Sequence, residues 1–163
     1  MALADGGCLL NIDDITMITK VKNFPELVCF RYNPGERRRG TQFIGVPVEA
    51  KYGLRHDQVI HAYRKAIARG AKRFGIHTMI ISNERNYQYM VETVKMLLDI
   101  MEMVTAELHI KFDFFNISGG IGIPYRPEDT RFDMTAFVRE TKSLLVGFQQ
   151  RQGYTPKLFT ELG

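Results

Sequence analysis

Strand-forming runs and amphipathic helical stretches alternate along the whole of this 163-residue chain. A strand, a helix and a second strand in succession form a right-handed crossover, which places the two strands parallel to each other in one sheet. Five strands are predicted in this way, at residues 8–12, 26–32, 73–77, 110–117 and 156–161. The alternation therefore predicts an α/β fold built on a parallel sheet, in which every strand ends at the same edge.

The helices between these strands are predicted from apolar spacing and from residues that favour helix ends. Apolar side chains recur at helical spacing over residues 56–69. A second helix is expected to begin at residues 82–84, and a third at residues 127–129 with its end near residue 150. After the first strand, Asp13 and Asp14 are expected to cap a short helix. Residues 34–52 are rich in glycine and are expected to form one long loop.

The composition is that of one soluble globular domain. Hydrophobic residues make up 45% of the chain, which is enough for a core at this length. No apolar run approaches the roughly 18 residues of a membrane helix, and the first residues lack the basic region of a signal peptide. We therefore expect a cytoplasmic protein with no membrane partner. Cys8 and Cys29 lack CxxC spacing, so both are expected to be buried, reduced thiols, and no metal site is predicted.

A net charge of +4 and the basic triplet Arg37-Arg38-Arg39 raise the question of nucleic-acid binding. Outside this triplet, basic and acidic residues are interspersed, and no known nucleic-acid-binding signature is present. The triplet is expected to lie in a solvated loop, with binding of an anionic substrate or partner as the alternative. No nucleic-acid partner is predicted.

A glycine-rich turn follows the fourth predicted strand, with the sequence Asn-Ile-Ser-Gly-Gly-Ile-Gly at residues 116–122. Backbone N–H groups in such a turn can close on an oxyanion, which is usually a phosphate. Glycine after a strand is also common in plain turns, and this alternative stays open at the level of the motif alone.

The strand ends carry further polar residues that a parallel sheet would bring to one site. They are Arg31 and Asn33, residues 77–82, residues 118–125, and Glu161. This set suits a phosphorylated aromatic cofactor, because Ser82 offers a hydroxyl to a phosphate and Glu161 offers a carboxylate to a ring nitrogen. His77 or Arg31 would supply a polar or stacking group. The alternatives are that His77 is a core histidine, that Arg31 is an ion-pair residue inside a barrel, and that Glu161 is a simple strand-end carboxylate.

Residues 116–128 resemble the phosphate loop of the diaminopimelate decarboxylases, which are pyridoxal-phosphate enzymes related to ornithine and arginine decarboxylases. Residues 31–35, 50–54 and 70–77 are similar to further segments of that family, in the same order. The resemblance implies a TIM-type (β/α)8 barrel followed by a β-rich domain. On this comparison, residues 1–163 form a single partial pyridoxal-phosphate-binding barrel domain, from about strand 4 to strand 8. The N-terminal barrel strands and the C-terminal β-domain are expected to be absent.

The resemblance also implies cofactor contacts for residues of this chain. Ser118, Gly119 and Gly120 match the turn that cradles the phosphate, where a close backbone approach requires the absence of a side chain. Ser82 matches a serine that contacts the phosphate. Glu161 matches the glutamate of the family's E-P-G-R motif, which keeps the pyridine nitrogen protonated so that the ring can act as an electron sink.

Two positions depart from the family pattern. Leu162 replaces the proline of the E-P-G-R motif, while Gly163 keeps its glycine and is included among the expected cofactor-binding residues. In most members one strand reads G-x-H-x-H-x-G-S, and its second histidine stacks on the cofactor ring. Here Met79 stands at that second position and His77 at the first. A methionine sulfur can pack on an aromatic face, and His77 and Arg31 remain expected cofactor contacts.

The activity that the resemblance implies is a pyridoxal-phosphate-dependent carboxy-lyase reaction, from meso-2,6-diaminopimelate to L-lysine and CO2, with a small amino acid as substrate. The family's Schiff-base lysine lies in a motif that is not found here, and Lys51 matches a different loop. No catalytic residue is therefore assigned, and the chain alone is expected to be inactive. The alternatives are a carboxynorspermidine or arginine decarboxylase, or a noncatalytic half-barrel. Unpaired barrel edges would favour a homodimer or other self-association.

Overall fold

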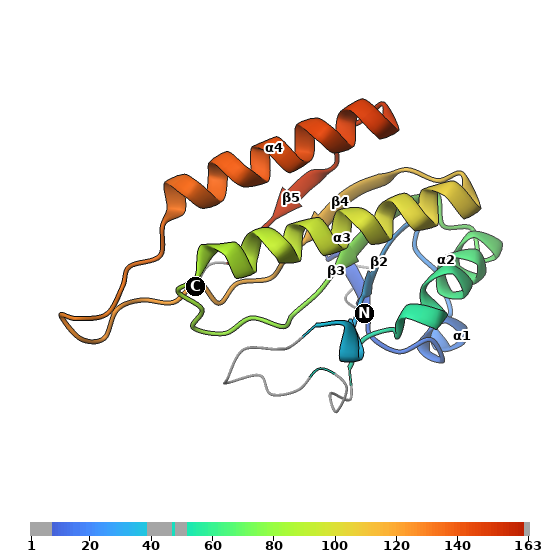
Figure 1. Ribbon diagram of the computed structural model, residues 1–163. Helices are drawn as coiled ribbons and strands as arrows, with labels where there is room; N and C mark the ends of the chain where they lie inside the picture. The colour runs from blue at the N-terminus through green and yellow to red at the C-terminus, as the bar shows by residue number, and fades with distance from the viewer. Residues whose placement is uncertain (1–7, 39–46, 48–51, 162–163) are drawn as a thin grey trace.

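The computed structural model describes residues 8–38, 47 and 52–161, and its centre is one five-stranded sheet (Figure 1). All neighbouring strands are parallel, and they lie in chain order across the sheet. The strands are β1 (Leu10–Ile12), β2 (Leu27–Arg31), β3 (Arg73–His77), β4 (Phe112–Asn116) and β5 (Lys157–Phe159). The predicted parallel α/β fold is confirmed.

Helical segments connect the successive strands. They are α1 (Met17–Lys20) after β1; η1 (Gly35–Arg37), η3 (His56–Gln58) and α2 (Val59–Ala68) after β2; α3 (Tyr87–Leu108) after β3; and α4 (Met134–Gln152) after β4. The long helix α3 packs against α2 and against α4 (Figure 1). Across the described ranges, no helix combines the length and the apolar content needed to span a bilayer.

Tyr63 of α2 lies at the centre of the core and is fully buried. Its ring meets those of Phe30, Phe74 and Phe112 edge to face, with centroids 4.9, 5.9 and 5.2 Å away. Its hydroxyl donates a hydrogen bond of 2.8 Å to the carbonyl oxygen of Gly75 in the middle of β3. Edge-to-face pairs of this kind stabilise a fold by about 1 kcal/mol each, so these contacts hold α2 firmly on β2, β3 and β4.

The start of α3 differs from its prediction. The helix begins at Tyr87 instead of at residues 82–84, because the preceding residues pair with the glycine turn. The backbone N–H of Glu84 donates to Gly120 O, and that of Gly122 donates to Glu84 O, both at 2.8 Å. The side chain of Asn86 then accepts a hydrogen bond from the N–H of Gln88 and caps the helix.

The start of α4 was also predicted too early. Asp129 does not cap a helix, because its carboxylate accepts hydrogen bonds from the backbone N–H groups of Tyr125 and Arg126 and so closes a turn. Asp133 caps α4 by accepting from the N–H of Ala136 at 2.8 Å. The result is an extended connection between the glycine turn and α4 (Figure 1).

Two expectations for the first third of the chain are corrected. Asp14 accepts hydrogen bonds from the N–H and the hydroxyl of Thr16 ahead of α1, and it is Thr16 that stands at the N-cap position. Cys8 is exposed, contrary to its expected burial, because it precedes β1 instead of lying within it. Cys29 is buried as expected, and burial raises the pKa of its thiol, with a further contribution from the negative charge of Glu161.

The outer strands of the sheet have one open side each. Among the described residues, β1 pairs only with β2, and β5 pairs only with β4. Phe159 of β5 stacks on Phe114 with ring centroids 4.7 Å apart and is still 40% exposed. Open edges of this kind favour pairing with further strands, so self-association through them remains a prediction.

Candidate functional site

Three polar side chains share one face of the sheet at the ends of neighbouring strands. Arg31 of β2 is in register with His77 of β3, and His77 is in register with Asn116 of β4. Residues in register across a parallel sheet point to the same face, so these side chains form a row. Arg31 and His77 were both predicted to converge at this edge, and the structure brings them together.

His77 is 6% exposed and is held from one side only. Its Nδ1 atom lies 2.8 Å from the side-chain nitrogen of Asn11 on β1, whereas its Nε2 atom is buried and lacks a hydrogen-bond partner among the described residues. Burial lowers the pKa of His77 from 6.5 to about 4; the carboxylate of Glu161 opposes this effect and the cation of Arg31 adds to it. His77 is therefore a neutral imidazole at pH 7, with one ring nitrogen left for a ligand.

Glu161 follows β5 and contacts the residues that end β4. Its Oε1 atom accepts a hydrogen bond of 2.7 Å from the side-chain nitrogen of Asn116, and its Oε2 atom lies 3.5 Å from the hydroxyl oxygen of Ser118. Its backbone N–H donates to the carbonyl oxygen of Ser118 at 2.9 Å. The exposed carboxylate is thus held beside the glycine turn.

The glycine turn itself packs against the residues after β3. Gly120 has a φ of +88°, and a Cβ atom at this position would lie 2.5 Å from Ile81 O and 3.0 Å from the Cα atom of Ser82. Ser118, with a φ of +63°, and Gly119 are both buried. The turn and Ser82 are therefore neighbours, as predicted, and the close approach excludes any side chain at residue 120.

Arg31, at one end of the row, contacts the backbone of Met79 after β3. The Nη2 atom of Arg31 donates to the carbonyl oxygen of Met79 at 3.3 Å, and its guanidinium lies 5.7 Å from the centre of the Tyr52 ring. No ion pair is seen for Arg31 within the described part of the chain, so the ion-pair alternative finds no support there. The Met79 side chain is 44% exposed and is available to a ligand.

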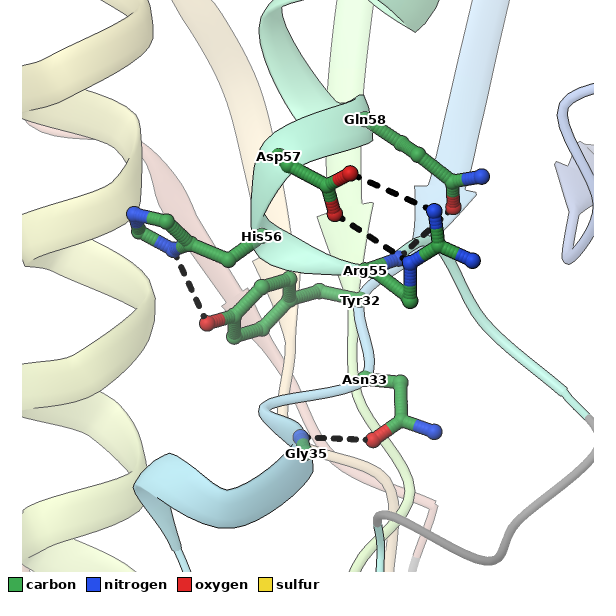
Figure 2. A network of polar contacts seen from close by, with 7 residues as sticks. All are labelled: Tyr32, Asn33, Gly35, Arg55, His56, Asp57 and Gln58. Atoms are coloured by element: carbon green, nitrogen blue, oxygen red, sulfur yellow. Dashed lines mark hydrogen bonds and ion pairs between the residues drawn. The ribbon is translucent and has the colours of Figure 1, made fainter.

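Further polar contacts lie among residues 32–35 and 55–58 (Figure 2). Tyr32 places its hydroxyl 3.2 Å from His56 Nδ1, and Arg55 forms an ion pair of 3.2 Å with Asp57. The carboxamide of Asn33 accepts a hydrogen bond from the N–H of Gly35 at 2.9 Å. A cavity of about 560 Å³ opens between these segments and the residues that follow β1, and neither Arg31, His77 nor Asn116 lines it.

Comparison with known sequences gives the family. The family described as "Pyridoxal-dependent decarboxylase, pyridoxal binding domain" matches residues 1–163, which is the entire chain. The chain belongs to this family. The resemblance predicted from residues 116–128 is thereby confirmed.

Members of the pyridoxal-dependent decarboxylase family that resemble this chain are much longer. Protein TabA of Pseudomonas amygdali pv. tabaci is 37% identical over all of the chain and 38% of its own length. Diaminopimelate decarboxylase of Thermoplasma acidophilum is 35% identical over 81% of the chain and 33% of its own length. The chain thus spans little more than a third of these relatives.

Solved structures of decarboxylases share the fold. The diaminopimelate decarboxylase of M. jannaschii aligns with a TM-score of 0.78 at 20% identity, over 94% of this chain and 37% of its own. The arginine decarboxylase of Paramecium bursaria Chlorella virus aligns with a TM-score of 0.71 at 14% identity, over 98% of this chain and 40% of its own. The parallel sheet therefore corresponds to part of a decarboxylase barrel.

Sequence reasoning missed two members of this candidate site, Asn11 and Asn116, which contact His77 and Glu161. Both are amides on strands that are otherwise mostly apolar or aromatic, and this contrast is the signal that could have identified them. Two residues of the resemblance lie outside the described residues. They are Gly163, an expected cofactor contact, and Lys51, which matches a different loop from the one with the Schiff-base lysine.

Proposed function

We propose that this chain binds pyridoxal phosphate at the ends of its strands and belongs to an enzyme that converts meso-2,6-diaminopimelate to L-lysine and CO2. The observation that carries the proposal is the closure of the Ser118–Gly120 turn on Ser82, with the carboxylate of Glu161 fixed beside it. A turn without side chains suits a phosphate, and a fixed carboxylate suits a protonated ring nitrogen.

The residues present fit this cofactor in three respects. The absence of a side chain on Gly120 lets the turn pack directly on the backbone of Ile81 and Ser82, which places the backbone of the turn beside Ser82. The buried Nε2 atom of His77 lacks a partner among the described residues, and a polar group of the ligand would satisfy it. The Oε2 atom of Glu161 has only a long contact of 3.5 Å and can accept a second hydrogen bond.

Each residue then has a role in the proposed reaction. When bound, pyridoxal phosphate supplies an electron-withdrawing ring that accommodates the electron pair left after CO2 departs. Glu161 holds a proton on the ring nitrogen, while Ser82 and the turn hold the phosphate. His77 is neutral at pH 7 and binds without adding charge, whereas Arg31 supplies a cation at the edge of the site.

The substrate is proposed from the relatives. Several of the similar sequences are diaminopimelate decarboxylases, and a structure from M. jannaschii is a co-complex with L-lysine. An arginine decarboxylase is the second candidate, because the viral enzyme covers nearly the whole chain with the same fold. Decarboxylation assays of the full-length enzyme with both amino acids decide between the two, since only the true substrate releases CO2.

Pyridoxal phosphate is expected to bind this chain at least about ten-fold more tightly than pyridoxal, which has no phosphate. An absorbance titration of the aldehyde measures both affinities. Glu161→Gln is expected to weaken binding of both ligands, because the ring nitrogen loses its charged partner. Glu107→Gln removes the same charge from an exposed position of α3 and serves as the control. Equal binding of the two ligands would contradict the phosphate site, and equal binding by the wild type and Glu161→Gln would contradict the role of Glu161.

The chain alone is expected to form no L-lysine from meso-2,6-diaminopimelate, even with pyridoxal phosphate added. The reason is the proposal that the lysine that binds the cofactor covalently is not among residues 1–163. The measurement is L-lysine formation by the purified chain over hours, detected by mass spectrometry. Turnover above that of free pyridoxal phosphate would refute this proposal while leaving the binding site intact.

A further inference from the structure

Asn116, the last residue of β4, joins the glycine turn to Glu161. Its side-chain nitrogen donates to Glu161 Oε1, and its side-chain oxygen accepts from the backbone N–H of Ser118, both at 2.7 Å. The carbonyl oxygen of Ser118 accepts the backbone N–H of Glu161 at 2.9 Å. The three hydrogen bonds form a closed ring that connects a strand end, the turn and the carboxylate.

The orientation of the Asn116 amide follows from its partners. A backbone N–H can only donate, so the oxygen of the amide must face Ser118. The NH2 group then necessarily faces Glu161, where it meets a carboxylate that can only accept while it is ionised. Asn116 therefore donates to Glu161 and holds one of its two oxygens in place.

The same amide supports the unusual backbone of the turn. Ser118 has a φ of +63°, which is uncommon for a residue with a side chain. The bond from its N–H to the Asn116 oxygen spans two residues and stabilises this conformation. One side chain thus sets the geometry at the start of the turn as well as the position of the carboxylate.

A carboxylate in place of this amide would reverse the interaction. Aspartate has nearly the same shape as asparagine and could still accept from Ser118, but its second oxygen would face Glu161 at hydrogen-bond distance. Two carboxylates this close cannot both ionise readily, and the pair would bind one shared proton at a pH where single carboxylates are charged. The neutral amide avoids this conflict.

We propose that Asn116 is a positioning residue that directs Glu161 at the ring nitrogen of pyridoxal phosphate, while it also shapes the phosphate turn. This inference rests on the proposed function of the site. Asn116 itself has both polar atoms engaged within the protein, so it acts on the ligand through Glu161 and Ser118.

The test is Asn116→Asp, compared with Asn86→Asp as the matched control. Asn86 is exposed at the start of α3, and aspartate caps helices as well as asparagine does, so the control adds the same charge facing the N–H of Gln88 instead of Glu161. The dissociation constant of pyridoxal phosphate is measured for each protein between about pH 5.5 and pH 8.5. At each pH the constant of the variant is divided by that of the wild type, and this ratio cancels the titration of the ligand.

Asn116→Asp is expected to weaken binding about ten-fold at the alkaline end and to approach the wild type at the acid end, where a shared proton restores the donor to Glu161. The double variant Asn116→Asp with Glu161→Gln is compared with Glu161→Gln alone. The ratio of their dissociation constants is expected to stay constant with pH, because only one carboxylate remains. Asn86→Asp is expected to match the wild type throughout.

A ratio for Asn116→Asp that does not change with pH would overturn the positioning role, since a purely structural defect weakens binding equally at every pH. Absence of binding by the wild type would overturn the proposed function and this role together. The wild-type titration therefore separates the two failures.

Discussion

Gly120→Ala is expected to lower the free energy of unfolding by about 3 kcal/mol. Two costs add at this position. A φ of +88° disfavours any L-residue with a side chain, by about 1 kcal/mol or more. The new methyl group would also lie 2.5 Å from Ile81 O and 2.8 Å from Ile81 C, so the backbone of one of the two segments would have to move. Urea unfolding followed by circular dichroism gives the difference in free energy.

Gly70→Ala is the matched control for this substitution. Gly70 also has a positive φ, of +95°, but a Cβ atom there would have nothing within 4 Å. It is expected to cost about 1 kcal/mol, which is the conformational part alone. The difference between the two variants, about 2 kcal/mol, then measures the close approach of the turn to the residues after β3. Equal losses would show that the turn does not touch this segment in solution.

The strand positions could be predicted because each strand is a short run of apolar and aromatic residues between turn residues. The start of β3 at Arg73 matches the prediction, since Gly70 ends the preceding helix. The starts of α3 and α4 could not be predicted in the same way. Several acidic and amide residues precede each helix, and tertiary contacts decide which of them becomes the cap.

The candidate site was predictable to the extent that topology determines it. Ser118 and Glu161 were expected to be neighbours because parallel strands end at one edge, and they are. The partners Asn11 and Asn116 depend on the register between strands, which the sequence of a single strand does not contain. The depression of the pKa of His77 likewise requires its burial, which is a property of the assembled sheet.

Acidification is expected to destabilise the protein through His77. The pKa of this residue is about 4 in the folded state and close to 6.5 when unfolded, so between these values the unfolded chain binds more protons. Stability conferred by the neutral imidazole is therefore fully present above about pH 6.5 and is lost as the pH falls toward 4. Between pH 7 and pH 5 the loss from this residue alone is about 2 kcal/mol.

The measurement is urea unfolding at both pH values for the wild type, His77→Gln and His61→Gln. His77→Gln removes the titrating ring and is expected to retain only the smaller acid sensitivity that His56 contributes, because partial burial and the nearby Arg37 lower the pKa of His56 as well. His61 lies exposed on α2, and its replacement is expected to leave the pH dependence of the wild type unchanged. If His77→Gln loses as much stability on acidification as the wild type does, the ring is not buried in a neutral form, and its Nε2 atom would no longer be a candidate contact for the cofactor.

Bound pyridoxal phosphate offers a second check, since a ligand that satisfies Nε2 changes the pKa of the ring and should alter this pH dependence in the wild type but not in His77→Gln.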